Sequence, residues 1–212
     1  MNKLFTAAMG LALTATALTA SAQKKYTEGT ATYEASVNGQ SVEAKVMFKG
    51  DSSVTVMQQG PANIKVLSFK EDYLAVLVDV PVANMKKAAI ATPGELEDAL
   101  SKMPSFTFTP TTETKQIAGF NCKKVVAKDT KSNTSFDAWV TTDISAPASA
   151  FSTLYAKVGG FPVQFTISQM GRNVTNTLKA ISDVKVPAGT FGIPAGYDKM
   201  TLTELSAMSG GR

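Results

Sequence analysis

The chain has 212 residues, of which 21 are basic and 17 acidic, and it contains no histidine and a single cysteine. The usual zinc, copper and haem sites draw on imidazole or on clustered thiolates, so this composition argues against all of them, and one cysteine excludes an intramolecular disulfide. Nearly all the basic residues are dispersed lysines, with arginine only at Arg172 and Arg212, so nucleic acid is not an expected partner.

The N-terminal segment is typical of a cleaved export signal. Lys3 supplies a positive charge, an apolar stretch covers residues 4–18, and Ala20-Ser21-Ala22 fits the small-residue cleavage rule. A transmembrane anchor is the alternative, but it needs about 20 apolar residues, and threonines interrupt this stretch. No cysteine stands at the cleavage point to carry an N-terminal lipid. We therefore expect residues 1–22 to be a signal peptide removed after Ala22, and the mature chain to be periplasmic or secreted.

Beyond the signal, alternation of apolar and polar residues predicts a series of β-strands. Ala31, Tyr33 and Ala35 alternate with polar neighbours, Asn38-Gly39 supplies a hairpin turn, and the alternation resumes over residues 42–48. This pattern is typical of an antiparallel sheet with one solvent-facing side. Further strands are expected at 53–57, 64–69 and 73–80. The last of these is nearly continuous in apolar residues, so we expect it to be covered on both faces.

Two amphipathic helices are expected to interrupt the strands. The first begins with Thr92 as N-cap and Pro93 and Glu95 in its first turn, an arrangement that forms a capping box, and it ends before Pro104. The second covers residues 151–158, where apolar residues repeat at helical spacing ahead of Gly159-Gly160. Each helix has a single apolar face that needs a surface to pack on.

Strands are expected to resume at 105–109, 115–129, 134–141, 161–170 and 174–186. About ten strands and two short helices indicate an α+β domain, in which an extended antiparallel sheet forms an open half-barrel covered by the two short amphipathic helices. A closed barrel is the alternative. We favour the open sheet because both helices need somewhere to dock.

Five short motifs occur in order along the chain: "YTEGTATYE" from Tyr26, "IAGFNCKK" from Ile117, "AWVTTDI" from Ala138, "VGGFP" from Val158 and "FGIPAGYDKM" from Phe191. Together they resemble an uncharacterised secreted family of Gram-negative bacteria, a domain of unknown function that is similar in layout to the GLPGLI family. The resemblance covers about residues 26–202. It implies an unclosed barrel with a helical lid, like the LolA and LolB lipoprotein carriers, and it implies no enzymatic activity. We accordingly expect a single LolA-like half-barrel domain at residues 23–204 and a flexible tail at 205–212.

The single cysteine, Cys122, has two interpretations. A buried free cysteine behaves as a small hydrophobic residue, and a bulge at Lys123-Lys124 would turn four residues inward together, Phe120, Cys122, Val125 and Ala127. The alternative is a reactive thiolate whose pKa the neighbouring lysines lower. Cysteine nucleophiles normally recruit a general base, most often histidine. We therefore expect a packed and unreactive thiol.

Three classes of function remain open. The first is a non-enzymatic carrier that binds a lipid or another apolar small molecule on the concave face of the sheet. The second is a cell-envelope interaction or structural protein with a filled core, whose partner is another envelope protein. The third is a histidine-free hydrolase that uses two carboxylates, although no motif identifies such a pair. We expect a protein that is not an enzyme and that has no catalytic residues, metal site or cofactor.

The expected ligand site lies between the second helix and the strand that follows it. Gly159-Gly160 turn the helix directly back onto that strand, so the two apolar faces border the same space. Its lining is mainly aromatic and uncharged, which suits an apolar molecule. The predicted ligand-binding residues are Phe151, Leu154, Tyr155, Phe161, Val163, Phe165 and Ile167.

Overall fold

The computed structural model describes residues 23–37, 39–169 and 172–208 of the chain, so the expected signal peptide lies outside the described residues. Within this part, fourteen strands and two α-helices follow one another. The first seven strands are β1 Lys24–Lys25, β2 Glu28–Val37, β3 Gln40–Lys49, β4 Ser52–Gln59, β5 Ala62–Phe69, β6 Tyr73–Val80 and β7 Met85–Ile90. The other seven are β8 Phe106–Ile117, β9 Phe120–Asp129, β10 Ser135–Thr141, β11 Ile144–Ser145, β12 Phe161–Gln169, β13 Arg172–Ser182 and β14 Asp198–Met200.

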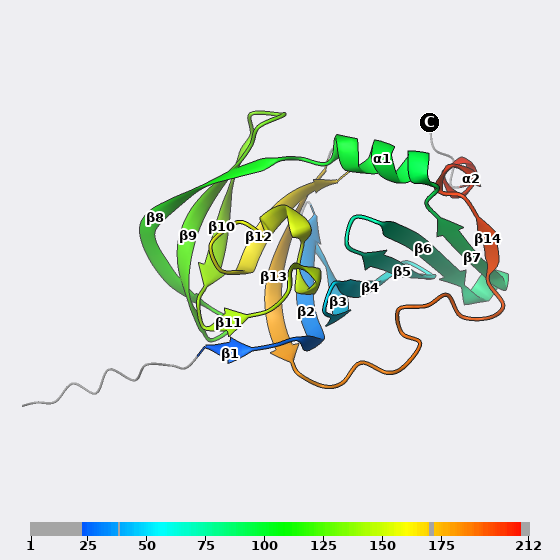
Figure 1. Cartoon of the computed structure of the whole chain (residues 1–212), viewed down its shortest axis with the longest axis horizontal. Coiled ribbons are helices and arrows are strands. Elements are labelled where there is room, and N and C mark those ends of the chain that lie inside the picture. The colour runs from blue at the N-terminus through cyan, green and yellow to red at the C-terminus, as the bar shows by residue number, and fades with distance from the viewer. Residues whose placement is uncertain (1–22, 38, 170–171, 209–212) are drawn as a thin grey trace, which may run out of the picture.

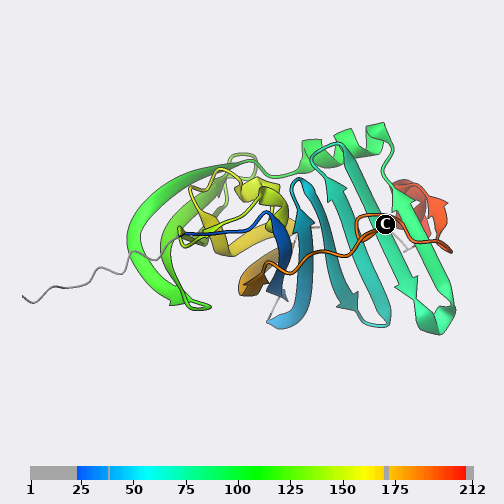
Figure 2. The same cartoon turned by 60° about the horizontal axis from the view of Figure 1, so that its bottom comes forward.

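Twelve of the strands form one sheet in the order β14-β7-β6-β5-β4-β3-β2-β13-β12-β10-β9-β8, and β1 and β11 form a separate parallel pair. Neighbours in the large sheet are antiparallel except β14 and β7. The sheet curls over at the end formed by β8 and β9 (Figures 1 and 2), and its two edge strands, β8 and β14, do not meet. The predicted open antiparallel sheet is confirmed, with more strands than the roughly ten expected.

Alternate residues of β3 contribute to two hydrophobic clusters on opposite faces of the sheet, because successive side chains of a strand point to opposite sides. Val46 and Phe48 belong to what we call the inner cluster, on the inner face, whereas Met47 packs against an outer cluster. The largest buried members of the inner cluster are Tyr26, Tyr33, Phe48, Trp139, Tyr155, Phe161 and Phe165. The buried members of the outer cluster are Val54, Leu67, Ala75, Leu77 and Ala88.

The segment between β13 and β14 covers the outer cluster. Figure 2 shows it running across the strands of the sheet, and three of its side chains, Phe191, Ile193 and Tyr197, pack against the buried residues there. The start of the segment is fixed by Glu28, whose Oε1 accepts a hydrogen bond of 2.8 Å from the Val186 amide. The chain therefore supplies its own cover for the outer face.

The second predicted helix is wrong. Residues 148–155 form two 3-10 turns, η2 Ala148–Ala150 and η3 Thr153–Tyr155, and between them Phe151 and Ser152 leave the helical region with φ of −141° and −152°. Pro147, Ser149 and Ser152 favour turns over a continuous helix, and tertiary packing decides the outcome. Tyr33 from β2 donates a buried hydrogen bond of 3.1 Å to the Ala150 carbonyl, so this segment is an inserted part of the inner cluster.

The first predicted helix is confirmed as α1, Pro93–Lys102. Thr92 Oγ1 accepts from the Glu95 amide while Glu95 accepts from the Thr92 amide, which is the predicted capping box. Helix α1 connects β7 to β8 and lies across one end of the sheet (Figure 1). The second α-helix is α2, Leu202–Met208, which includes residues 205–208 of the segment expected as a tail. Among the described residues, no helix is long and apolar enough to cross a membrane.

Candidate functional site

The structure brings all seven predicted ligand-binding residues into the inner cluster. Tyr155, Phe161, Val163 and Phe165 are buried there, and the other three, Phe151, Leu154 and Ile167, are partly buried and pack against them. The short connection through Gly159-Gly160 therefore does bring the two apolar faces together, although one face is carried by 3-10 turns. The seven residues are part of a packed core in this arrangement.

Tyr155 is the centre of this packing. Its ring centre lies 5.0 Å from that of Phe165, 5.2 Å from Phe106 and 5.6 Å from Phe108. Its hydroxyl donates a hydrogen bond to the Thr166 carbonyl, and burial raises the pKa of the Tyr155 phenol to about 12. The neutral phenol thus fills the space between the curled end of the sheet and β12, with its polar atom satisfied.

Cys122 also faces the inner cluster, with 1% of its surface exposed. Phe120, Val125 and Ala127 are in the same cluster, as expected, but the pairing shifts in the neighbouring strand, between Pro110 and Thr114 of β8. The thiol donates a weak hydrogen bond of 3.5 Å to the Phe120 carbonyl, and burial raises its pKa. Both effects oppose formation of a thiolate.

We expect Cys122 to be unreactive in the native protein. A thiol reagent should label it only after denaturant is added, because the reactive form is the exposed thiolate. Replacing it with alanine should lower the free energy of unfolding by about 1 kcal/mol, the usual cost of a modest change in a core. Titration with a chromogenic disulfide, with and without denaturant, measures the first effect. Complete labelling of the native protein within seconds is the result that contradicts it.

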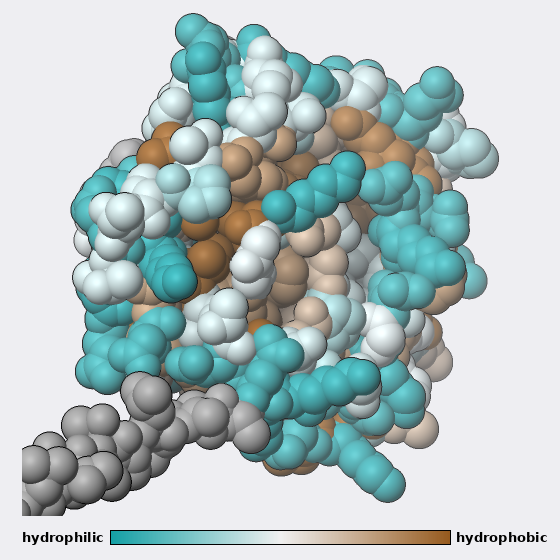
Figure 3. Space-filling model, turned by 60° about the vertical axis from the view of Figure 1, so that its left-hand side comes forward, coloured by the Kyte–Doolittle hydropathy of each residue, from teal (hydrophilic) through white to brown (hydrophobic). Residues whose placement is uncertain are grey.

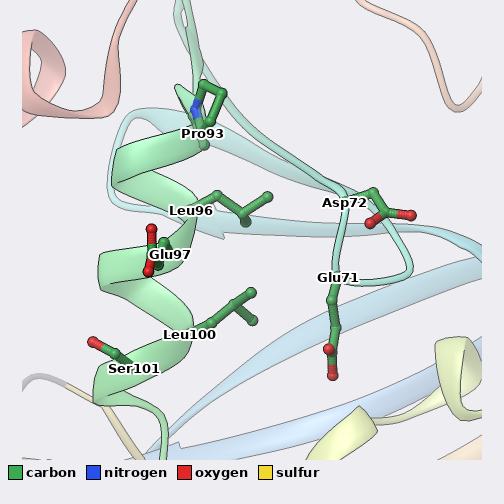
Figure 4. A pocket seen from close by; sticks show the side chains of 8 residues that line it. Glu71, Asp72, Pro93, Leu96, Glu97, Leu100 and Ser101 are labelled. Carbon is green, nitrogen blue, oxygen red and sulfur yellow. The ribbon is translucent and has the colours of Figure 1, made fainter.

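A groove of about 590 Å³ separates α1 from the turn that joins β5 to β6. We call it the α1 groove, and it is lined by Glu71, Asp72, Ala91, Pro93, Leu96, Glu97, Leu100 and Ser101. Figure 4 shows Leu96 and Leu100 pointing from the helix toward the turn. None of the residues of α1 is buried. An amphipathic helix normally buries its apolar face against the core, so the groove leaves this face without a packing partner.

Helix α1 is instead fixed at its ends. At the N-terminal end, Glu95 accepts hydrogen bonds from the amide and the hydroxyl of Thr203 in α2, at 2.7 and 2.6 Å. The Thr203 hydroxyl is the main reason that the pKa of the Glu95 carboxyl falls to about 2. At the C-terminal end, Lys131 Nζ donates to the carbonyls of Ser101 and Met103, where a positive charge also complements the helix dipole. Both ends of α1 are therefore held in place beside the groove.

A band of partly exposed apolar side chains continues from the groove along the inner face. Paired residues of neighbouring strands lie on the same face of a sheet. Val66, Val76 and Ala89 are connected by such pairings across β4 to Val46 of the inner cluster, so they lie on the inner face. The band consists of Ile64, Val66, Leu74, Val76 and Val78, all partly exposed and in neither cluster. It reaches the groove at Leu74, whose carbonyl accepts from the amide of the groove residue Ala91 at 3.0 Å.

Figure 3 shows the molecule from the side of β8 and β9. Hydrophobic residues gather in a hollow in the middle of this view, and hydrophilic residues surround it. On this side of the molecule, the apolar surface is therefore recessed.

A second hollow, of about 670 Å³, is lined by residues of β8, β9, β10, β12 and β13 and is mostly polar. Its charged groups are engaged with one another: Lys124 Nζ lies 2.9 Å from Asp137 and 3.1 Å from Glu113. Lys115 Nζ lies 4.0 Å from the centre of the Trp139 ring and covers it. These contacts leave few polar groups available to a ligand.

The acidic residues of the α1 groove do not form a catalytic pair. Figure 4 shows the side chains of Glu71, Asp72 and Glu97 pointing in different directions, with no common point at which two carboxylates meet. Across the residues that the structure describes, no three His, Cys, Asp or Glu side chains gather where they could hold a metal ion. The groove is thus an apolar surface with carboxylates around it.

Comparisons with known proteins give likenesses of fold. No protein-family model matches the sequence, and no curated protein matches it significantly. Among solved structures, PNGF-II is 17% identical with a TM-score of 0.48, over 85% of this chain and 32% of its own. A DUF1329 family protein from Desulfovibrio piger ATCC 29098 is 9% identical with a TM-score of 0.37, over 79% of this chain and 90% of its own.

A third solved structure is MucB in complex with MucA(peri). It is 12% identical with a TM-score of 0.35, and the match covers 83% of this chain and 56% of the MucB chain. The chain thus spans about a third of PNGF-II and just over half of MucB. All three likenesses concern the arrangement of strands and none of them assigns a function.

Proposed function

We propose that this is an exported, non-enzymatic binding protein that holds a lipid or another apolar ligand on the inner face of its sheet, beneath α1. The observation that carries the proposal is the α1 groove, where Leu96 and Leu100 stay partly exposed above a volume of about 590 Å³. Pockets that bind small molecules typically have about 300–1,000 Å³, so the groove has the size of a ligand site.

The physical driving force is the removal of apolar surface from water. Each square ångström of apolar surface that a ligand covers contributes about 25 cal/mol. The lining leucines, Pro93 and the adjoining inner-face band offer such surface to a chain that enters from the groove. Because α1 is fixed at both ends, little of this energy is spent in ordering the helix.

A second function is favoured by a different observation. The seven residues predicted from the sequence to bind ligand are packed against one another in the inner cluster. A filled core of this kind fits an interaction or structural protein of the cell envelope, whose partner is another protein. The two proposals differ in whether the α1 groove binds small apolar molecules.

Removing the apolar lining of the groove tests the first proposal. We expect the neutral dye N-phenyl-1-naphthylamine to bind the protein, with a rise in fluorescence. Changing both Leu96→Ser and Leu100→Ser should weaken binding about thirtyfold, because each truncation removes roughly 1 kcal/mol of apolar contact. Since neither leucine is buried, this double variant should fold.

Val82→Ser with Val184→Ser is the matched control, because these residues are 84% and 68% exposed and do not line the groove. Dye binding that is equal in both double variants contradicts the proposal and favours the filled-core protein. Native mass spectrometry of protein purified from its own envelope then identifies any natural ligand.

A further inference from the structure

We propose that the α1 groove is selective for amphiphiles whose head group is positively charged. The apolar chain lies against Leu96 and Leu100, and the cationic head lies at the mouth of the groove, in the negative field of the rim that Glu71, Asp72 and Glu97 form. This inference rests on the proposed function, because it names the class of ligand that the same groove takes.

The charged residues around the groove are all of one sign. Three of its eight lining residues are acidic and none is basic. The chain as a whole has the opposite balance, with 21 basic and 17 acidic residues. A negative rim on a basic protein favours a cationic ligand and disfavours an anionic one, because like charges next to each other are repulsive.

A further feature of the three rim carboxylates, shared with Asp79, Asp143 and Glu204, is the absence of an ion pair within the described residues. Among the described residues, none of the three takes part in an ion pair, whereas Glu113, Asp137 and Asp198 do. Their negative charge is therefore available to a ligand.

The lysines near the groove are already engaged. Lys70, next to Glu71 in the chain, pairs with Asp51 at 3.6 Å, and Lys102 pairs with Asp98 at 2.6 Å on α1 itself. Lys131 donates to carbonyls at the end of α1. With these cations occupied elsewhere, the head group of a ligand is the group that can balance the rim.

Three ligands with the same ten-carbon chain separate the effect of charge from that of apolar contact. Decylamine, 1-decanol and decanoate carry a positive, a neutral and a negative head group at pH 7. Each is titrated against the bound dye N-phenyl-1-naphthylamine. Decylamine should displace the dye at a concentration roughly tenfold lower than decanoate, because the negative rim attracts the ammonium group and repels the carboxylate. The difference should shrink in about 0.5 M salt, because exposed charges are screened.

The variant that tests the rim carries Glu71→Gln, Asp72→Asn and Glu97→Gln together. All three side chains are exposed, so the fold should be kept, and decylamine and decanoate should then displace the dye equally well. The matched control removes three acids elsewhere, with Glu34→Gln, Glu43→Gln and Asp183→Asn. It makes the same change in net charge, and it should keep the preference for decylamine.

The outcomes separate this inference from the proposed function. If the dye binds in the groove but decylamine and decanoate displace it equally from the wild-type protein, the inference is wrong and the apolar-ligand function stands. The inference is also wrong if the control variant loses the preference as fully as the rim variant. If the dye does not respond to the leucine substitutions, the proposed function fails, and the inference fails with it.

Discussion

Replacing Phe165 with alanine is expected to lower the free energy of unfolding by about 3–5 kcal/mol, the range for removal of a buried aromatic side chain from a core. Phe165 is 3% exposed. Its ring centre lies 5.8 Å from that of Tyr33 and 5.0 Å from that of Tyr155. The substitution therefore leaves a cavity between β2, β12 and the 3-10 turns. Urea unfolding followed by circular dichroism measures the loss.

Phe69→Ala is the control for this prediction, because Phe69 is 43% exposed and its removal should cost about 0.5 kcal/mol or less. A small loss for Phe165→Ala, combined with weaker binding of an apolar ligand, contradicts the filled core. That result returns the ligand site to the place predicted from the sequence, between Phe151 and Ile167.

The second large effect is expected at Asp129, a carboxylate that is 6% exposed at the end of β9. It accepts hydrogen bonds from the amides of Ser105, Lys131 and Ser132 and a short one, 2.6 Å, from the Ser132 hydroxyl. Asp129→Ala leaves three backbone amides without this partner and should destabilise the protein by about 3 kcal/mol. Asp51→Ala, which removes only an exposed ion pair with Lys70, should cost about 1 kcal/mol or less.

The same carboxylate predicts a pH dependence. The Ser132 hydroxyl, followed by the backbone amides, lowers the pKa of Asp129 below its ordinary value. A group whose pKa is lower in the folded state stabilises the protein above the ordinary carboxyl pKa of about 3.9, and this stabilisation is lost as the pH falls through the folded pKa. The difference in urea midpoint between the wild type and Asp129→Asn should therefore shrink below about pH 4. A difference that stays constant from pH 7 to pH 2.5 contradicts this role.

Much of the sheet could be predicted from the sequence because strand and hairpin signals are local. The alternation from Ala31 onward identifies β2 and β3, and Val37 pairs with Gln40 across the expected two-residue turn. The capping box at Thr92 identifies α1. In each of these cases the residues that form the sequence pattern also make the contacts, and they lie close together in the chain.

The second helix could not be predicted correctly, because its conformation depends on distant residues. The apolar spacing from Phe151 to Val158 fits a helix, yet these side chains pack into a cluster built from β2, β9 and β12. Helix α2 is held by a contact between Thr203 and Glu95, which lie far apart in the chain and share no sequence motif.

The apolar surface beside α1 does have a signal in the sequence, at β6. The continuous apolar run of Tyr73–Val80 predicted cover on both faces. In the structure, Ala75 and Leu77 are buried in the outer cluster, whereas Leu74 and Val76 are partly exposed on the inner face. The combination of a strand that is apolar on both sides and a neighbouring helix with no fully buried residue indicates apolar surface that the fold leaves partly exposed.

The strand order also determines how late in synthesis β2 can acquire its second neighbouring strand. Strands β2–β7 and β8–β10 pair with their neighbours in the sequence, but the two groups are joined only through β12 and β13, which lie between β10 and β2. A chain that is synthesised N-terminus first therefore leaves one edge of β2 unpaired until residue 182 has appeared, since Ser182 pairs with Thr30. An exposed strand edge recruits other chains, and pairing over such a separation is slow. Newly made chains are thus expected to be most prone to aggregation before β13, Arg172–Ser182, is complete.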